Sequence, residues 1–151
     1  MEVHSRGSYP SNALSNFAGH RFVIDDIQCN SMEGFVQSLK FKAPDMQEHI
    51  CSLVGMGAKK AGSGKNWYTT QTLWWRGQPI HRSSEGYQEL ISRAYDCMFE
   101  QSESFRKALQ ACGKDARFTH SIGKKKENET VMTEKEFCSQ LHRLQRKLFN
   151  V

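Results

Sequence analysis

The sequence has few of the features that mark membrane, exported or disulfide-stabilised proteins. No stretch approaches the roughly 20 consecutive apolar residues that a membrane helix needs, and the first residues lack the apolar run of a signal peptide. The five cysteines are widely spaced, with no C-x-x-C pair and no histidine at zinc-finger spacing. We therefore expect a soluble, cytoplasmic protein with reduced, buried thiols, no metal site and no membrane partner.

Linker-like and repetitive segments are also lacking. The chain has only three prolines, none of which forms a linker, and no internal repeat or low-complexity tract is visible. Its 151 residues match the length of one ordinary domain, and a hydrophobic content of 38% is enough to form a core. We predict a single domain over residues 1–151, as either a monomer or a homo-oligomer.

Acidic residues are fewer than basic ones, which gives the chain a net positive charge. Lys and Arg number 21 against 16 for Asp and Glu, so the net charge is +5, a sign that suits a phosphate-bearing ligand. The loop Gly62-Ser63-Gly64-Lys65 is not a Walker motif, because Lys59 and Asn66 stand where Gly and Ser or Thr are required. The loop could still bind a pyrophosphate through backbone N–H groups and lysines, or be a solvated basic loop.

Helical patterns dominate the chain, with two hairpins between them. β-Branched residues on both sides of Asp25-Asp26 predict a short hairpin over residues 22–29, and an aromatic-rich segment predicts a second over 72–81. Helical spacing and capping residues predict helices over residues 31–41, from Asp45 to a stop at Gly55, over 84–100, over 102–112, and from a capping box at Thr133 to about Leu148.

Two polar segments on this framework could line a pocket. In the helix over residues 31–41, Glu33, Gln37 and Lys40 share one face beside an apolar stripe, which suits either a pocket wall or a solvent-exposed face. The connector over residues 119–128 combines a glycine with three lysines, and loops of this kind often carry binding residues. From this connector we select as ligand-binding candidates His120, Ser121, Gly123, Lys124 and Asn128.

Three ordered motifs resemble the landmarks of the NADAR family, also called YbiA-like. Its members show an L/F-S-N-F segment, an S-x-E-H-x-x-Q-x-x-K-F helix about 15 residues later, and a basic loop that ends in Trp. The matching segments here are Leu14-Ser15-Asn16-Phe17, Ser31-Met32-Glu33-Gly34-Phe35-Val36-Gln37-Ser38-Leu39-Lys40-Phe41 and Lys65-Asn66-Trp67. The resemblance covers about residues 10 to 148, and the chain looks like a T-even-phage member of the family.

The resemblance implies an α+β, mostly helical domain with a small β-sheet or hairpins, and an activity that cleaves N-glycosidic bonds at a ribose. It implies no cofactor and no metal. The bonds cleaved in the family include the one between ADP-ribose and a modified guanine. The residues that we expect to be catalytic are Glu33, Lys65 and Trp67. The residues that we expect to bind ligand, besides those of the connector, are Ser15, Asn16, Phe17, Gln37, Lys40 and Gly64.

These residue types suit that chemistry. Breaking a bond between C1′ and nitrogen builds positive charge on the ribose, so the Glu33 carboxylate would stabilise the transition state and accept a proton from water. Trp67 could stack on a base or exclude water. Alternatively, Lys65 or Lys40 could attack a ring-opened ribose aldehyde as a Schiff base, if burial leaves the amine neutral.

The sequence departs from the family pattern at two places. Gly34 stands where members usually carry His, and the family's D-x-x-W-G segment, which supplies an acid and a second tryptophan, has no clear match around residues 117–124. His120 could act instead as an acid or base. The missing acid could be replaced by Glu127 or Glu129, and the missing aromatic by Trp74 or Trp75.

Three functions remain open on the sequence alone. The first is an N-glycosidase that removes ADP-ribose from guanine in DNA or RNA; a phage protein would then act in the host cytoplasm to undo ADP-ribosylation of phage DNA by a host toxin. The nucleic acid would be attracted by residues 124–126 and by the basic face of the last helix. The second is a protein that sequesters ADP-ribose or a related nucleotide without hydrolysis. The third is an N-glycosidase that acts on riboflavin-pathway intermediates.

Overall fold

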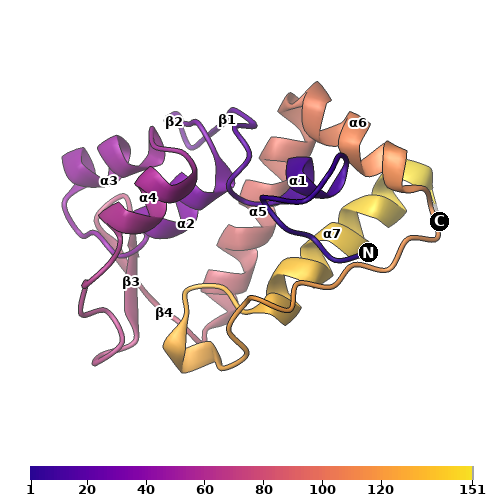
Figure 1. Ribbon diagram of the computed structural model, residues 1–151. Helices are drawn as coiled ribbons and strands as arrows, with labels where there is room; N and C mark the ends of the chain where they lie inside the picture. Colours follow the sequence, from indigo (N-terminus) through magenta and orange to yellow (C-terminus); the bar gives the residue numbers. More distant parts are fainter. Residues whose placement is uncertain (151) are drawn as a thin grey trace.

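A long helix lies at the centre of the computed structural model, which describes residues 1–150 (Figure 1). This helix is α5 (Glu85–Gln101). The elements before it are α1 (Ser11–Leu14), β1 (Phe22–Ile24), β2 (Ile27–Cys29), α2 (Met32–Ser38), α3 (Pro44–Cys51), α4 (Gly55–Ala61), β3 (Thr72–Trp75) and β4 (Gln78–His81). The elements after it are α6 (Glu103–Cys112), a short 3-10 turn over Glu127–Glu129, and α7 (Glu134–Phe149). This architecture confirms the expected mostly helical α+β fold with small hairpins.

Both predicted hairpins form. β1 and β2 pair antiparallel with Ile24 opposite Ile27, and the turn residues Asp25 and Asp26 adopt left-handed conformations, with φ of 49° and 66°. Two successive positive φ angles are typical of tight hairpin turns, and Asp tolerates them. β3 and β4 also pair antiparallel, with Trp75 opposite Gln78.

Local capping residues set the starts of four helices, as the sequence predicts. The hydroxyl of Ser31 accepts a hydrogen bond from the Gly34 N–H at 3.0 Å, and Ser84 and Ser102 cap α5 and α6 in the same way. Thr133 forms the expected reciprocal capping box at the start of α7. Each cap satisfies backbone donors that the first helical turn would otherwise leave unpaired.

The prediction for residues 45–55 is partly wrong. The helix that begins there ends at Cys51, and Gly55 does not stop it but is the first residue of α4. Gly55 has a φ of +52°, a backbone conformation that glycine adopts without steric cost. Because α4 is short and contains two glycines, its apolar periodicity is too weak to predict a helix.

Gly34 allows α2 to pack tightly against the end of α3. A Cβ atom at this position would lie 2.6 Å from the carbonyl oxygen of Leu53 and 3.0 Å from those of Cys51 and Ile50. Any side chain would therefore displace backbone. This close approach explains why the residue after Glu33 is glycine rather than the histidine usual in NADAR proteins.

The core joins elements from both ends of the chain. Its largest fully buried side chains include Phe22, Phe35, Tyr87, Tyr95 and Arg82. Trp75 also belongs to this core: its ring lies 5.1 Å from that of Phe35, and its indole N–H donates to Asp25 Oδ2 at 2.8 Å. No helix within residues 1–150 is long and apolar enough to cross a membrane.

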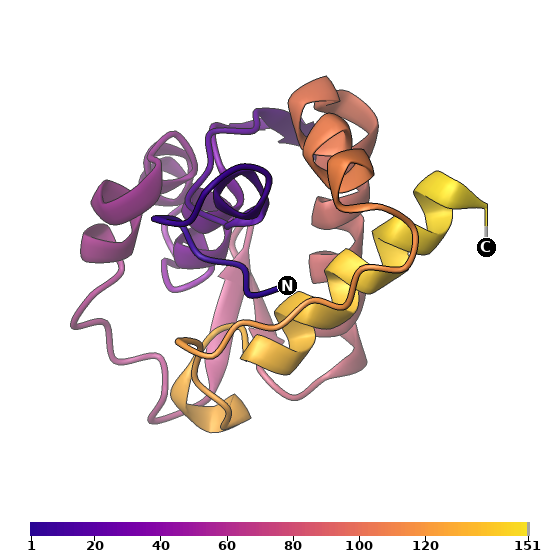
Figure 2. The same cartoon turned by 45° about the vertical axis from the view of Figure 1, so that its right-hand side comes forward.

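The connector between α6 and α7 runs back alongside α7 (Figure 2). The N-terminal segment pairs with it, because Val3 N–H donates to the Thr119 carbonyl oxygen and Thr119 N–H to that of Met1, at 2.8 and 2.9 Å. A parallel bridge between Glu2 and Thr119 accompanies these bonds. The connector is thereby held opposite the N-terminal half of the chain.

Candidate active site

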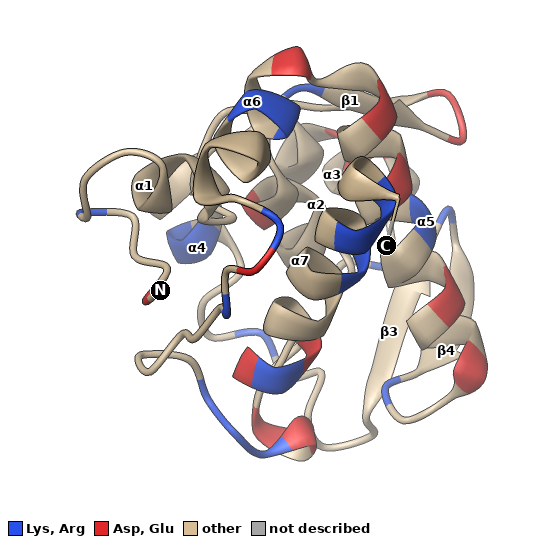
Figure 3. Cartoon of the chain, turned by 90° about the vertical axis from the view of Figure 1, so that its right-hand side faces the viewer, with Lys and Arg blue, Asp and Glu red and all other residues tan. Residues whose placement is uncertain are grey.

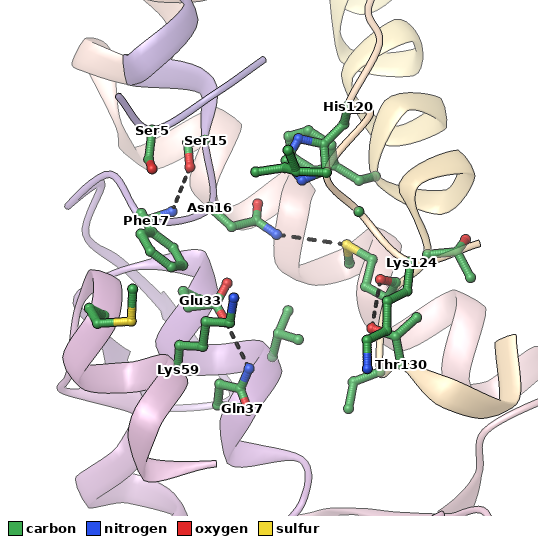
Figure 4. Close-up of a pocket in the computed structure, with 18 of the residues that line it drawn as sticks. Ser5, Ser15, Asn16, Phe17, Glu33, Gln37, Lys59, His120, Lys124 and Thr130 are labelled. Atoms are coloured by element: carbon green, nitrogen blue, oxygen red, sulfur yellow. Dashed lines mark hydrogen bonds between the residues drawn. The ribbon is translucent and has the colours of Figure 1, made fainter. Parts of the chain in front are cut away.

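A cavity of about 570 Å³ lies between the N-terminal half of the chain and the connector. Figure 4 shows Asn16, Glu33 and Lys59 on one side, with His120 and Lys124 on the other. Its volume falls in the range of small-molecule sites. Of the residues predicted from sequence, the cavity is lined by Ser15, Asn16, Phe17, Glu33, Gln37, Lys40, Trp67, His120, Gly123 and Lys124.

Glu33 lies in the first turn of α2 with its side chain in the cavity. Its backbone N–H donates to the Asn16 carbonyl oxygen at 2.9 Å, which joins the first NADAR-like motif to the second. Burial raises the pKa of the Glu33 carboxyl above its usual value, against the opposing effects of a Gln37 hydrogen bond and the positive charges of Lys59 and Lys40. The carboxylate is thus partly desolvated but surrounded by groups that favour its charged form.

Gln37 orients this carboxylate. Its Nε2 donates to Glu33 Oε2 at 2.7 Å, while its Oε1 is buried and has no hydrogen-bond partner among residues 1–150. Gly62 packs directly against the amide, because a Cβ at Gly62 would lie 1.8 Å from Gln37 Oε1. Gly62 therefore fixes the position of Gln37, and Gln37 in turn fixes the position of Glu33.

Asn16 is held by a buried tyrosine. The hydroxyl of Tyr95, a fully buried residue, donates to Asn16 Oδ1 at 2.6 Å. This bond occupies the amide oxygen of Asn16, so the Nδ2 group remains as the donor; it lies 3.8 Å from the sulfur of Met132 in the cavity wall (Figure 4). Asn16 therefore presents a hydrogen-bond donor to a ligand.

Basic side chains surround the carboxylate. Lys40 Nζ donates to the Gly62 carbonyl oxygen at 3.1 Å, and burial lowers the pKa of Lys40. Lys59, Lys124 and Arg6 are exposed at the cavity wall. Positive charge at these points suits an anionic ligand such as a pyrophosphate.

The connector wall is closely packed around His120. The Nδ1 of His120 donates to the Val3 carbonyl oxygen at 2.8 Å, which leaves Nε2 as the ring nitrogen not used in that bond. The ring lies 5.0 Å from that of Phe137. Gly123 is required nearby, since a Cβ there would lie 2.8 Å from His120 Cδ2 and 2.9 Å from Glu134 Cβ.

Four predicted site residues lie outside the cavity wall. The N–H and hydroxyl of Ser121 donate to Glu2 Oε2 at 2.8 and 3.0 Å, and the Asn128 carbonyl oxygen accepts from Gln71. Gly64 is exposed at a φ of +75°, and Lys65 lies 4.8 Å from the ring centroid of Phe41. Lys65 instead lines a neighbouring hollow, which shares Lys40 and Trp67 with the cavity.

The structure also separates the residues considered as replacements for the D-x-x-W-G segment. Glu129 lines the cavity, whereas Glu127 does not. Trp75 belongs to the core, and Trp74 lines the neighbouring hollow. The cavity wall also includes three residues that the sequence motifs do not predict: Arg6, Lys59 and Met132. Of these, only Lys59 could have been predicted from the sequence, because it is a basic residue near a glycine-rich loop.

The basic face of α7 is partly neutralised by acidic residues. Figure 3 shows the Lys and Arg positions gathered on this helix. Arg143 donates to Asp96 Oδ1 at 2.7 Å, and Lys147 lies 3.5 Å from Glu100. These pairs lower the net positive charge of this face, whereas Lys124 lines the cavity and is exposed.

The fold is that of a YbiA-like protein. The chain is similar to the Escherichia coli protein YbiA, whose structure was determined by NMR, with a TM-score of 0.65 and 18% identity over 99% of this chain and 84% of that one. The model of the family Bacteriophage protein GP30.3 matches residues 8–146, so the chain belongs to this family. It is also 39% identical to a 17.1 kDa protein of Enterobacteria phage T4 from the Gp30-rIII intergenic region, over 98% of each chain. These findings confirm the predicted resemblance to a phage member of the NADAR family.

Proposed function

We propose that the protein is an N-glycosidase that hydrolyses the bond between ADP-ribose and a guanine base in nucleic acid. The observation that carries this proposal is the Glu33 carboxylate, which is desolvated, hydrogen-bonded by Gln37 and flanked by basic side chains in a ligand-sized cavity. A carboxylate in such surroundings can stabilise a cationic transition state while lysines bind phosphates.

The reaction needs two proton transfers. Water attacks C1 of the ribose as its bond to the guanine nitrogen breaks, and ionised Glu33 stabilises the positive charge on the sugar and accepts the proton of the water. The guanine nitrogen that leaves must gain a proton. Glu129 also lines the cavity, so we assign it as the second carboxyl group, which donates this proton in place of the missing acid.

The cavity wall also suits ADP-ribose as a ligand. Lys40, Lys59 and Lys124 supply positive charge for the pyrophosphate, and Phe17 and Trp67 supply aromatic surface for a base. Of the two lysines considered as Schiff-base nucleophiles, Lys40 is the one in this cavity, and burial lowers its pKa. Borohydride reduction during turnover, followed by mass spectrometry, would trap a covalent adduct on Lys40 if the reaction took that route.

Turnover distinguishes the proposed enzyme from its alternatives. A guanine-ADP-ribosylated oligonucleotide incubated with catalytic amounts of protein should be converted completely to unmodified oligonucleotide and free ADP-ribose, as followed by mass spectrometry. Release of substrate unchanged, in an amount equal to the protein, would instead indicate sequestration. Cleavage of riboflavin-pathway intermediates without cleavage of the oligonucleotide would indicate the small-molecule activity. With the first result, the protein would reverse ADP-ribosylation of phage DNA in the host cytoplasm.

A further inference from the structure

A second hollow of about 520 Å³ adjoins the cavity and shares two of its wall residues, Lys40 and Trp67. Trp67 is buried and lines both spaces. Because the two spaces share these residues, a ligand that extends out of the cavity along Lys40 and Trp67 would enter the hollow. The remaining wall residues are Lys65, Asn66, Thr70, Thr72, Trp74 and Pro79.

The wall of the hollow combines aromatic surface with positive charge. Trp74 is half-buried on β3, and Lys42 Nζ lies 5.1 Å from the centroid of its ring. Lys65 Nζ lies 4.8 Å from the centroid of Phe41, and both Lys65 and Lys40 line the hollow. No carboxylate is among the residues that line the hollow. Stacking surface, phosphate-binding ammonium groups and short polar side chains together match the parts of an unpaired nucleotide.

We propose that this hollow binds the single-stranded segment of nucleic acid next to the modified guanine. The proposal rests on the proposed function for the identity of the cavity's ligand, but the binding of the strand can be measured without catalysis. An unpaired base stacks on Trp74, and the phosphates beside it contact Lys65 and Lys40. Lys65 therefore binds the polynucleotide rather than acting on the ribose, and single strands are preferred because a paired base cannot offer its face to Trp74.

The first test is the binding of an unmodified, dye-labelled single-stranded DNA of about ten nucleotides, followed by fluorescence anisotropy at several salt concentrations. Trp74→Ala should weaken binding about tenfold. Lys65→Gln, at an exposed position where folding is not at risk, should lower the slope of log K against log salt by about 0.7. Lys114→Gln, an exposed charge beyond the end of α6, is the matched control and should change neither quantity.

The second test compares kcat/KM for an ADP-ribosylated oligonucleotide with that for the ADP-ribosylated mononucleoside. Trp74→Ala should lower the ratio of kcat/KM for the oligonucleotide to kcat/KM for the mononucleoside by about tenfold. Unchanged single-strand binding in both variants, or equal affinity of the wild-type protein for duplex and single strands, would overturn the proposal even if hydrolysis occurs. If no substrate is cleaved but the variants weaken single-strand binding as stated, the proposed function fails and the strand-binding site stands.

Discussion

The amide of Gln37 is held between Glu33 and Gly62: Nε2 donates to Glu33 Oε2 at 2.7 Å, and Oε1 lies against the backbone of Gly62. Gln37 is one helical turn after Glu33 on α2, so the two side chains share a face and point into the same cavity. The end of α4 thus positions a carboxylate on α2, through a glutamine that need not touch the substrate.

Replacing Gly62 with alanine tests this positioning. The added Cβ would displace the Gln37 amide and weaken its hydrogen bond to Glu33, so we expect kcat to fall at least tenfold, with the acid limb of the pH–rate profile moved to higher pH. The shift is upward because Gln37 stabilises the ionised carboxylate. Gly57→Ala, in the open middle of α4, is the control: it should keep the profile and stabilise the helix by up to about 1 kcal/mol. Equal profiles for both variants would contradict the positioning role.

Glu33 should reduce stability at neutral pH, because its pKa is higher in the folded protein than in the unfolded chain. At low pH the carboxyl group is neutral in both the folded and the unfolded state, so it does not change the free energy of unfolding. As pH rises past the ordinary value of 4.5, the unfolded chain loses its proton first, and the folded state loses stability until pH passes the raised pKa. Glu33→Gln should therefore raise Tm at pH 7, and the gain should vanish near pH 4. Thermal unfolding measures this difference, and a gain that is independent of pH would contradict the assignment.

The two glutamates of the short 3-10 turn form a matched pair for testing the second carboxyl group. Glu129 lines the cavity and Glu127 does not, although both are exposed. Glu129→Gln should lower kcat about a hundredfold if it protonates the leaving base, since general acid catalysis contributes factors of that order. Glu127→Gln should leave kcat unchanged. Equal rates in the two variants would mean that solvent or another residue protonates guanine.

Arg82 is the main polar anchor beneath the connector wall. Its guanidinium is fully buried, forms two hydrogen bonds with Glu136, and donates to the Thr130 carbonyl oxygen at 2.8 Å. Arg82→Met should lower the free energy of unfolding by about 3–5 kcal/mol, because it leaves a partly buried carboxylate without its partner. Urea denaturation measures the loss. Lys107→Met, which removes an exposed ion pair with Glu103 on α6, is the control and should have no measurable effect; a similar loss in both would argue against a special role for Arg82.

Features that depend on neighbouring residues were predictable from the sequence. The helix caps at Ser31, Ser84 and Thr133 need only a side chain and a backbone N–H three residues later, and the Asp25-Asp26 turn needs only residues that tolerate positive φ. The shared position of Glu33, Gln37 and Lys40 in the cavity wall was predictable for a similar reason, because residues 4 and 7 positions apart lie on one face of a helix.

Features that depend on long-range packing were not predictable. Lys65 is two residues from Trp67 in sequence, but Trp67 lines both the cavity and the hollow, whereas Lys65 lines only the hollow. The wall opposite Glu33 includes Met132, whose position follows from contacts with Asn16 and Tyr95. The fit of Gly34 against the carbonyl oxygens after α3 explains the glycine there only once both helices are placed.

The most direct test of the central claim compares Glu33→Gln with the wild-type protein on a guanine-ADP-ribosylated oligonucleotide, with binding and single-turnover cleavage measured on the same samples. Glutamine keeps the shape of the side chain but cannot be ionised. We predict that the variant binds the substrate with a Kd within about threefold of the wild-type value, while the rate of ADP-ribose release falls by at least about a thousandfold. Release by Glu33→Gln at the wild-type rate would show that Glu33 is not the catalytic carboxylate and would contradict the account.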